Sequence, residues 1–103
     1  MADRLTQLLN LIAEMPDDAF LKYGIALEYV SRGNDNLALQ HFLELKKAQP
    51  QYLALYYQLG KLYERLQQND HAILSYNEGI EVARSKKDSH TLSELQSALD
   101  ELL

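Results

Sequence analysis

The sequence predicts an all-α fold built from a helical hairpin that occurs twice. Apolar residues recur every three or four positions along most of the 103 residues, which is the spacing of one helix face. Short stretches rich in Gly, Pro, Asn and Asp separate these segments, as turns between helices do. Positions 34 residues apart also carry side chains of the same size class, and this is the period of a two-helix repeat.

The repeat emerges when the stretch around residues 59–83 is compared with the chain 34 positions earlier. The matched pairs are Leu59 with Ile25, Gly60 with Ala26, Tyr63 with Tyr29, Tyr57 with Tyr23, Ala72 with Ala38, Tyr76 with Phe42, and Pro50 with Pro16. Few pairs are identical, yet each keeps its size class, which is what packing between helices preserves. Ala38 and Ala72 are expected where the two helices of each hairpin cross, because a larger side chain would force them apart.

Turn and capping residues divide the chain into six predicted helices. They are expected over residues 2–14, 17–32, 35–48, 51–67, 69–86 and 88–103. Either Asp17 or Asp18 can cap the second helix by accepting from free backbone N–H groups. Gly33 is suited to the left-handed conformation that ends this helix, and Pro50 ends the next one.

The first and last predicted helices are interpreted as caps that cover the apolar ends of the repeats. Their apolar stripes are Leu5, Leu8, Leu9 and Ile12 in the first, and Leu92, Leu95, Leu99 and Leu102 in the last. Thr91 and Glu94 have the spacing of a capping box at the start of the last helix. Gly24 lies inside the second helix, where close approach of the first helix is one explanation.

Composition limits the class of protein. The net charge is −5, which argues against a nucleic-acid partner, because such proteins present a basic face. There is no cysteine, so a disulfide framework and a thiolate zinc site are excluded. The N-terminal stretch resembles neither a signal peptide nor a membrane span, so we expect a cytoplasmic protein without a membrane partner.

No constellation of residues indicates catalysis, and we expect no enzyme activity, cofactor or metal. His90 and Glu94 lie four apart and could touch a metal, but a surface pair is the favoured interpretation. Asp17 and Asp18 are interpreted as a helix cap and not as a catalytic dyad. The short basic runs at residues 46–47 and 84–87 compensate helix dipoles, with an acidic docking patch as the lesser alternative.

The repeat resembles the tetratricopeptide repeat, a 34-residue helix–turn–helix family, and the chain resembles its small bacterial members. The second copy carries the pattern at Tyr56, Leu59, Gly60, Tyr63, Ala72, Tyr76 and Gly79. Three positions depart from it. Lys22 stands where a large residue belongs, Leu45 where a small one is usual, and Arg84 where the closing Pro belongs, so that the fifth helix is expected to run on.

The resemblance implies a right-handed α-superhelix and a single domain over residues 1–103. Its parts would be a capping helix (1–16), a first copy of the repeat (19–52), a second copy (53–86) and a C-terminal capping helix (88–103). The family implies a non-catalytic protein–protein interaction module or scaffold that binds a peptide in a concave groove. The alternative is a structural subunit that forms a weak homodimer through that groove.

By the same resemblance, the groove is lined by the first helix of each copy. The groove positions are Phe20, Tyr23, Leu27, Val30, Tyr57, Lys61, Glu64 and Arg65. The family's clamp for a C-terminal carboxylate is absent, because Tyr23 and Leu27 replace its Lys and Asn. Tyr57, Lys61 and Arg65 are four apart and form one row, which is expected to hold a peptide and to meet an acidic group. Alternatively, the terminal helix covers Tyr23, Leu27 and Val30.

Overall fold

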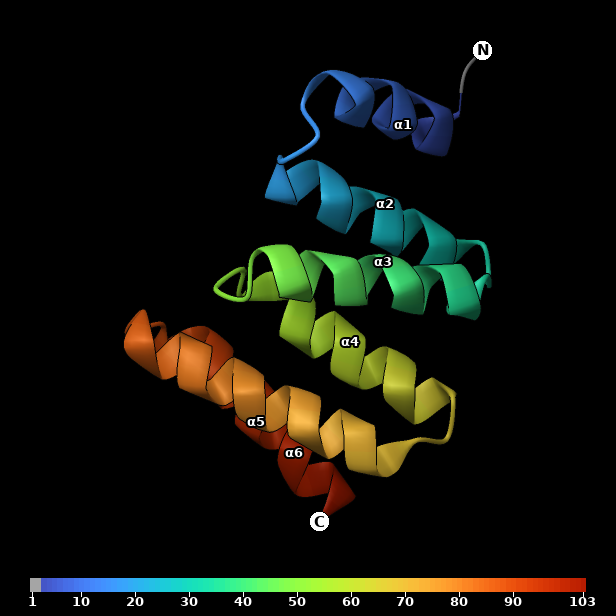
Figure 1. Cartoon of the computed structure of the whole chain (residues 1–103). Helices are drawn as coiled ribbons and strands as arrows, with labels where there is room; N and C mark the ends of the chain where they lie inside the picture. The colour runs from blue at the N-terminus through green and yellow to red at the C-terminus, as the bar shows by residue number, and fades with distance from the viewer. Residues whose placement is uncertain (1–2) are drawn as a thin grey trace. The chain divides into compact units, whose positions relative to one another are not determined.

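The computed structural model describes residues 3–103, and these residues form six α-helices and no strand (Figure 1). The all-α prediction is therefore confirmed. The helices fall into two compact units of three helices each, Met1–Tyr52 and Leu53–Leu103. The predicted start of the first helix at residue 2 lies outside the described residues. Among the helices described, none is both long and apolar enough to span a bilayer.

The first unit consists of α1 (Arg4–Glu14), α2 (Ala19–Ser31) and α3 (Asp35–Ala48). Helix α2 packs against both of the others. Leu8 of α1 meets Leu21 and Ile25 of α2 in the core. On the other side of α2, the side chains of Ala26, Ala38 and Phe42 are inaccessible to solvent. The small residue at Ala38 thus lies in a fully packed position, as the repeat predicts.

Side-chain caps fix where these helices begin, and they decide between the candidates in the sequence. Asp18, not Asp17, caps α2, since its carboxylate accepts from the backbone N–H of Leu21 at 2.9 Å. Asn34 caps α3 in the same manner. Between them, Gly33 has a φ of +75°, the left-handed conformation expected of a residue that ends a helix.

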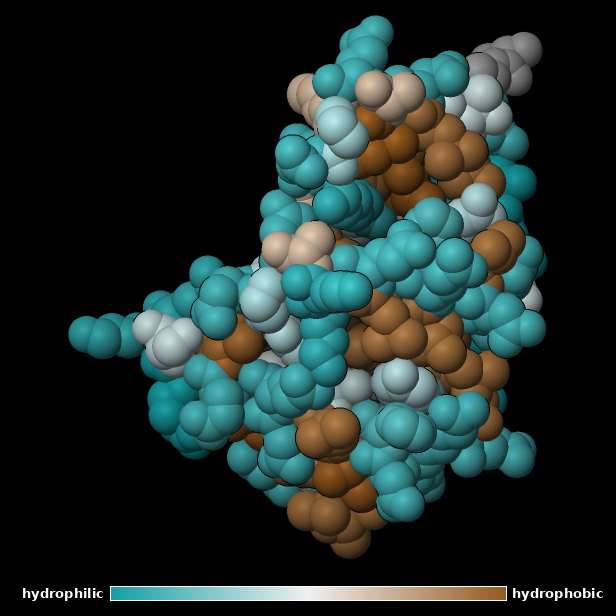
Figure 2. All heavy atoms as spheres, viewed as in Figure 1, coloured by the Kyte–Doolittle hydropathy of each residue, from teal (hydrophilic) through white to brown (hydrophobic). Residues whose placement is uncertain are grey.

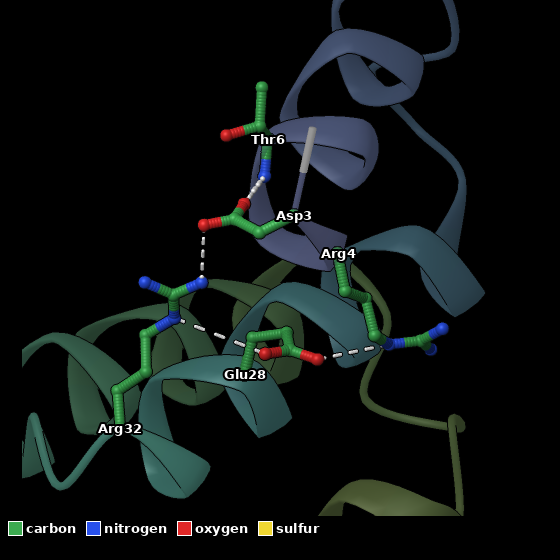
Figure 3. A network of polar contacts seen from close by, with 5 residues as sticks. All are labelled: Asp3, Arg4, Thr6, Glu28 and Arg32. Atoms are coloured by element: carbon green, nitrogen blue, oxygen red, sulfur yellow. Dashed lines mark hydrogen bonds and ion pairs between the residues drawn. The ribbon is translucent and has the colours of Figure 1, made fainter. Parts of the chain in front are cut away.

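Charged side chains also join α1 to the C-terminal end of α2 (Figure 3). Asp3 caps α1 by accepting from the N–H of Thr6 at 2.8 Å, and its second oxygen lies 2.8 Å from Arg32 Nη2. Arg4 Nε lies 3.1 Å from Glu28, and Arg32 lies 4.0 Å from the other oxygen of Glu28. These four side chains form a chain of alternating charge on the surface of the first unit.

The second unit consists of α4 (Ala54–Arg65), α5 (Asn69–Ser85) and α6 (Ser89–Leu102), with α5 packed against both neighbours. Helix α4 is shorter than predicted at both ends. A turn follows Pro50 and delays the start to Ala54. At the other end, Gln67 adopts a φ of 60°, which terminates the helix. Helix α5 extends to Ser85 and exceeds α3 by three residues, as the missing Pro predicted.

The predicted capping box of α6 is wrong. The cap is Asp88, whose carboxylate accepts from the backbone N–H of Thr91 at 3.0 Å and from its hydroxyl at 2.9 Å. Helix α6 therefore begins before Thr91, and Glu94 pairs with His90 instead. The apolar stripe of α6 is packed inward, with Leu95 inaccessible and Leu99 nearly so.

The two departures from the family pattern in the first copy fall at the positions that Tyr56 and Gly79 occupy in the second copy. A Cβ on Gly79 would lie 2.6 Å from the Cβ of Tyr56, so the large residue on α4 requires a small one on α5. At the same positions of the first copy stand Lys22 and Leu45, and Leu45 is fully buried. The large buried side chain is therefore Leu45 on α3 in the first copy and Tyr56 on α4 in the second copy.

Candidate interaction surface

The predicted row on α4 forms a half-buried surface with charged members. Tyr57 is partly buried, and its ring lies 6.3 Å from the ring of Tyr76. Lys61 Nζ lies 5.5 Å from the centre of the Tyr57 ring, a cation–π arrangement. Arg65, one turn further, is exposed. Tyr57 and Lys61 thus lie side by side on the same surface of α4.

Glu64 links this row to the core of the second unit. Its carboxylate accepts a hydrogen bond from the hydroxyl of Tyr76, which is inaccessible to solvent. The same carboxylate lies 3.7 Å from Lys61 Nζ. Burial raises the pKa of the Tyr76 phenol well above its ordinary value of 10.0, and Glu64 raises it further. Glu64 therefore holds Tyr76 and Lys61 in place.

A cavity of about 320 Å³ opens beside this row, between α4 and α6. Helix α4 contributes Tyr57 and Lys61 to its wall. Helix α6 contributes His90, Ser93, Glu94, Ser97, Ala98 and Glu101. The α6 residues were not among the predicted site residues. In the sequence they form the ordinary polar face of an amphipathic helix, and nothing local shows that this face borders α4.

Most ionisable side chains around the cavity have partners within the second unit. His90 Nε2 lies 2.6 Å from Glu94, and Lys61 lies near Glu64. Glu101 differs, because among the described residues no hydrogen bond or ion pair holds its carboxylate. Its charge nevertheless contributes to the raised pKa of the Tyr76 phenol.

The predicted positions in the first unit form a more apolar surface. Phe20 has 65% of its surface exposed. Tyr23 is partly buried, with its ring 5.5 Å from the ring of Tyr52 and 6.3 Å from that of Phe42. Leu27 and Val30 are also partly buried. That the terminal helix covers Tyr23, Leu27 and Val30 stays a prediction.

The other two histidines stack on tyrosine rings. The ring of His41 lies 5.1 Å from that of Tyr29, and the ring of His71 lies 5.0 Å from that of Tyr63. Within residues 3–103, no three His, Asp or Glu side chains gather in a way that would hold a metal ion. The His90–Glu94 pair is a direct contact between two side chains exposed to solvent.

Comparison with known proteins agrees with this architecture. The family model for the tetratricopeptide repeat matches residues 53–86. The solution structure of a tetratricopeptide repeat domain protein from Salinibacter ruber is 46% identical, with a TM-score of 0.81, over 84% of this chain and 88% of that one. A crystal structure of a tetratricopeptide repeat domain protein from the same organism is also 46% identical, with a TM-score of 0.79, over 82% and 96%.

A third solved structure is similar in fold at lower identity. This protein of Bordetella parapertussis is 24% identical, with a TM-score of 0.85, over 99% of this chain and 89% of that one. A search of curated proteins gave no match. The fold and the matches define an α-helical repeat protein. The chain belongs to the tetratricopeptide repeat family.

Proposed function

We propose that the chain is a non-catalytic protein–protein interaction module, a scaffold that binds a peptide segment along the groove face of its helices. The observation that carries the proposal is the partly exposed Tyr57 beside the open cavity between α4 and α6. Tyrosine offers a large contact area at a low cost in rotamer entropy, and its hydroxyl tolerates water. Members of this family generally bind proteins, and we place the chain in the cytoplasm as one domain without a cofactor.

The proposal is tested by selecting binders to the immobilised protein from a displayed library of random peptides. The variant Tyr57→Ala should keep its melting temperature within a few degrees and lose the selected peptides. The matched control Leu74→Ala removes an exposed apolar side chain on α5 and should retain them. Equal retention by both variants would place binding elsewhere on the protein.

Self-association remains a second candidate, favoured by the apolar surface of the first unit. Phe20, Leu9, Leu11 and Met15 of this unit are each exposed, and Figure 2 shows hydrophobic side chains gathered on its visible face along α1 and α2. A gathering of exposed apolar side chains marks a surface that binds other molecules. Light scattering over a range of concentrations tests this candidate, and a monomer at every concentration would overturn it.

A further inference from the structure

We propose that the cavity between α4 and α6 receives a positively charged side chain of the bound peptide, with Glu101 as its ion-pair partner. This inference rests on the proposed function and names the chemistry of the ligand. It also reverses the sequence-based expectation of an acidic group at Lys61. Every residue that lines the cavity lies within the second unit.

Lys61 is the positively charged side chain in the cavity wall, and its charge is already engaged. The ammonium group of Lys61 lies 3.7 Å from Glu64 and over the face of the Tyr57 ring. An anionic ligand would have to compete with Glu64 for this ammonium group, and would also meet the carboxylates of Glu94 and Glu101 in the cavity wall. Like charges within one cavity oppose binding.

The negative charge of Glu101, in contrast, is available to a ligand. No other described side chain forms a hydrogen bond or an ion pair with it. A carboxylate at the wall of a cavity can accept two parallel hydrogen bonds from a guanidinium group, a stronger arrangement than neutral hydrogen bonds provide. Ser93 and Ser97 add hydroxyl oxygens to the same wall, and these can accept from a bound arginine or lysine.

The volume of the cavity and the net charge of the chain agree with a positively charged side chain as the ligand. At about 320 Å³, the cavity lies at the lower end of the range of about 300–1,000 Å³ for small-molecule sites, which suits one long side chain. The chain carries a net charge of −5, so its field attracts cationic segments and repels acidic ones. The long apolar stem of a lysine or arginine can also pack along the ring of Tyr57.

The test is an NMR titration of the ¹⁵N-labelled protein with three blocked tripeptides that carry Arg, Glu or Leu between two alanines. We expect saturable shifts with the Arg peptide at the backbone amides of Tyr57, Ser97 and Ala98. The shifts should weaken as salt is added, since ions screen a pair at the surface. Equal shifts with the Glu peptide, or no saturable shift with the Arg peptide, would overturn the inference.

Two variants assign the effect to Glu101. Glu101→Gln should weaken binding of the Arg peptide at least about fivefold, because it removes the charge and keeps the shape. The matched control Asp100→Asn makes the same change one residue away, at a carboxylate that accepts from Gln96 at 3.0 Å and does not line the cavity. It should leave binding unchanged within about twofold. Equal binding by wild type and Glu101→Gln would refute the assignment.

The library selection separates this inference from the function on which it rests. Selected peptides should be enriched in Lys or Arg and should be lost with Glu101→Gln. If they are lost with Tyr57→Ala but are neither enriched in basic residues nor sensitive to Glu101→Gln, the inference fails and the proposed function stands. If no variant on α4 or α6 affects them, both fail.

Discussion

The ring of Tyr76 occupies the space in which residue 60 would carry a side chain. A Cβ on Gly60 would lie 2.7 Å from Tyr76 Cδ1, and the hydroxyl of the same ring is held by Glu64. At the same positions 34 residues earlier stand Ala26 and Phe42, a ring without a hydroxyl. The second copy thus combines a tethered ring with a glycine, and the first copy combines an untethered ring with an alanine.

Gly60→Ala should therefore destabilise the protein, although alanine is the better helix former. The gain in helix propensity is about 1 kcal/mol. The added methyl group meets a fully buried ring, and overpacking of this kind costs about 1–3 kcal/mol. Three atoms of the ring would lie under 3.0 Å from the added Cβ, so the upper end of this range applies. We expect a net loss of about 2 kcal/mol in the free energy of unfolding, measured by chemical denaturation. A gain in stability would show that the ring can move aside freely.

Tyr76→Phe provides the control for this explanation. Without the hydroxyl, the ring is released from Glu64 and can shift toward the arrangement of the first copy. The cost of Gly60→Ala should then be smaller in the Tyr76→Phe background than in the wild type, and a double-mutant cycle measures the difference. Equal costs in both backgrounds would refute the role of the tether.

Gly24→Ala should have the opposite effect. Helix α1 does approach Gly24, but a Cβ there would lie 3.4 Å from Leu8 Cδ1, which is an ordinary contact with the end of a flexible side chain. The gain in helix propensity then dominates, and we expect a stabilisation of about 0.5–1 kcal/mol. A rise in the melting temperature checks this prediction. A clear fall would mean that α1 and α2 pack more tightly than the contact distance indicates.

Gln67→Gly should also stabilise the protein. Gln67 and Gly33 are 34 residues apart, and both adopt a positive φ after a helix end, 60° and +75° respectively. In both, the next residue donates a backbone hydrogen bond of 2.9 Å back into the last helical turn. Glycine adopts this conformation without strain, so we expect a gain of about 0.5–1 kcal/mol. Gln67→Ala, which removes the same side chain but keeps a Cβ at the positive φ, is the control and should not stabilise.

The carboxyl group of Asp3 should titrate far below its ordinary pKa of 3.8. Its hydrogen bond from the backbone N–H of Thr6, and then its contact with Arg32, lower this pKa to about 2. Because the pKa is depressed in the folded state, the stabilisation is fully present above about pH 4. It is lost as the pH falls toward 2.

An NMR titration of the Asp3 side chain should give a midpoint near 2. The melting temperature of Asp3→Asn should fall less steeply than that of the wild type as the pH is lowered from 4 to 2. A midpoint near 3.8, or parallel curves, would show that Asp3 is free of both partners in solution.

Helix α6 should be required for cooperative folding of the second unit. Leu95 is inaccessible and would lie 3.0 Å from a Cβ on Gly79, so Leu95→Ala leaves a cavity against α5 and should cost about 2–4 kcal/mol. Leu103→Ala, at a side chain with 80% of its surface exposed, is the control and should be neutral. Deletion of residues 89–103 should broaden or abolish the thermal transition, and a sharp transition would show that α6 is an appendage.

The sequence alone determined the class of fold, because helical periodicity and the 34-residue repeat are local properties of side-chain size and spacing. The six described helices each begin within three residues of their expected positions for the same reason. Two helix boundaries could not be read from the sequence. The end of α4 at Gln67 lacks the glycine that usually marks a positive φ. The cap at Asp88 was missed because Thr91 and Glu94 have the spacing of a capping box.

Only the tertiary structure decided the candidate site. Tyr57, Lys61 and Arg65 could be placed in a row from their spacing, but the engagement of Lys61 and Tyr76 by Glu64 depends on how α4 packs against α5. The cavity and the available carboxylate of Glu101 depend on α6 lying beside α4, about 40 residues further along the chain. Such contacts are set by the summed packing of three helices, and no short stretch of sequence encodes them.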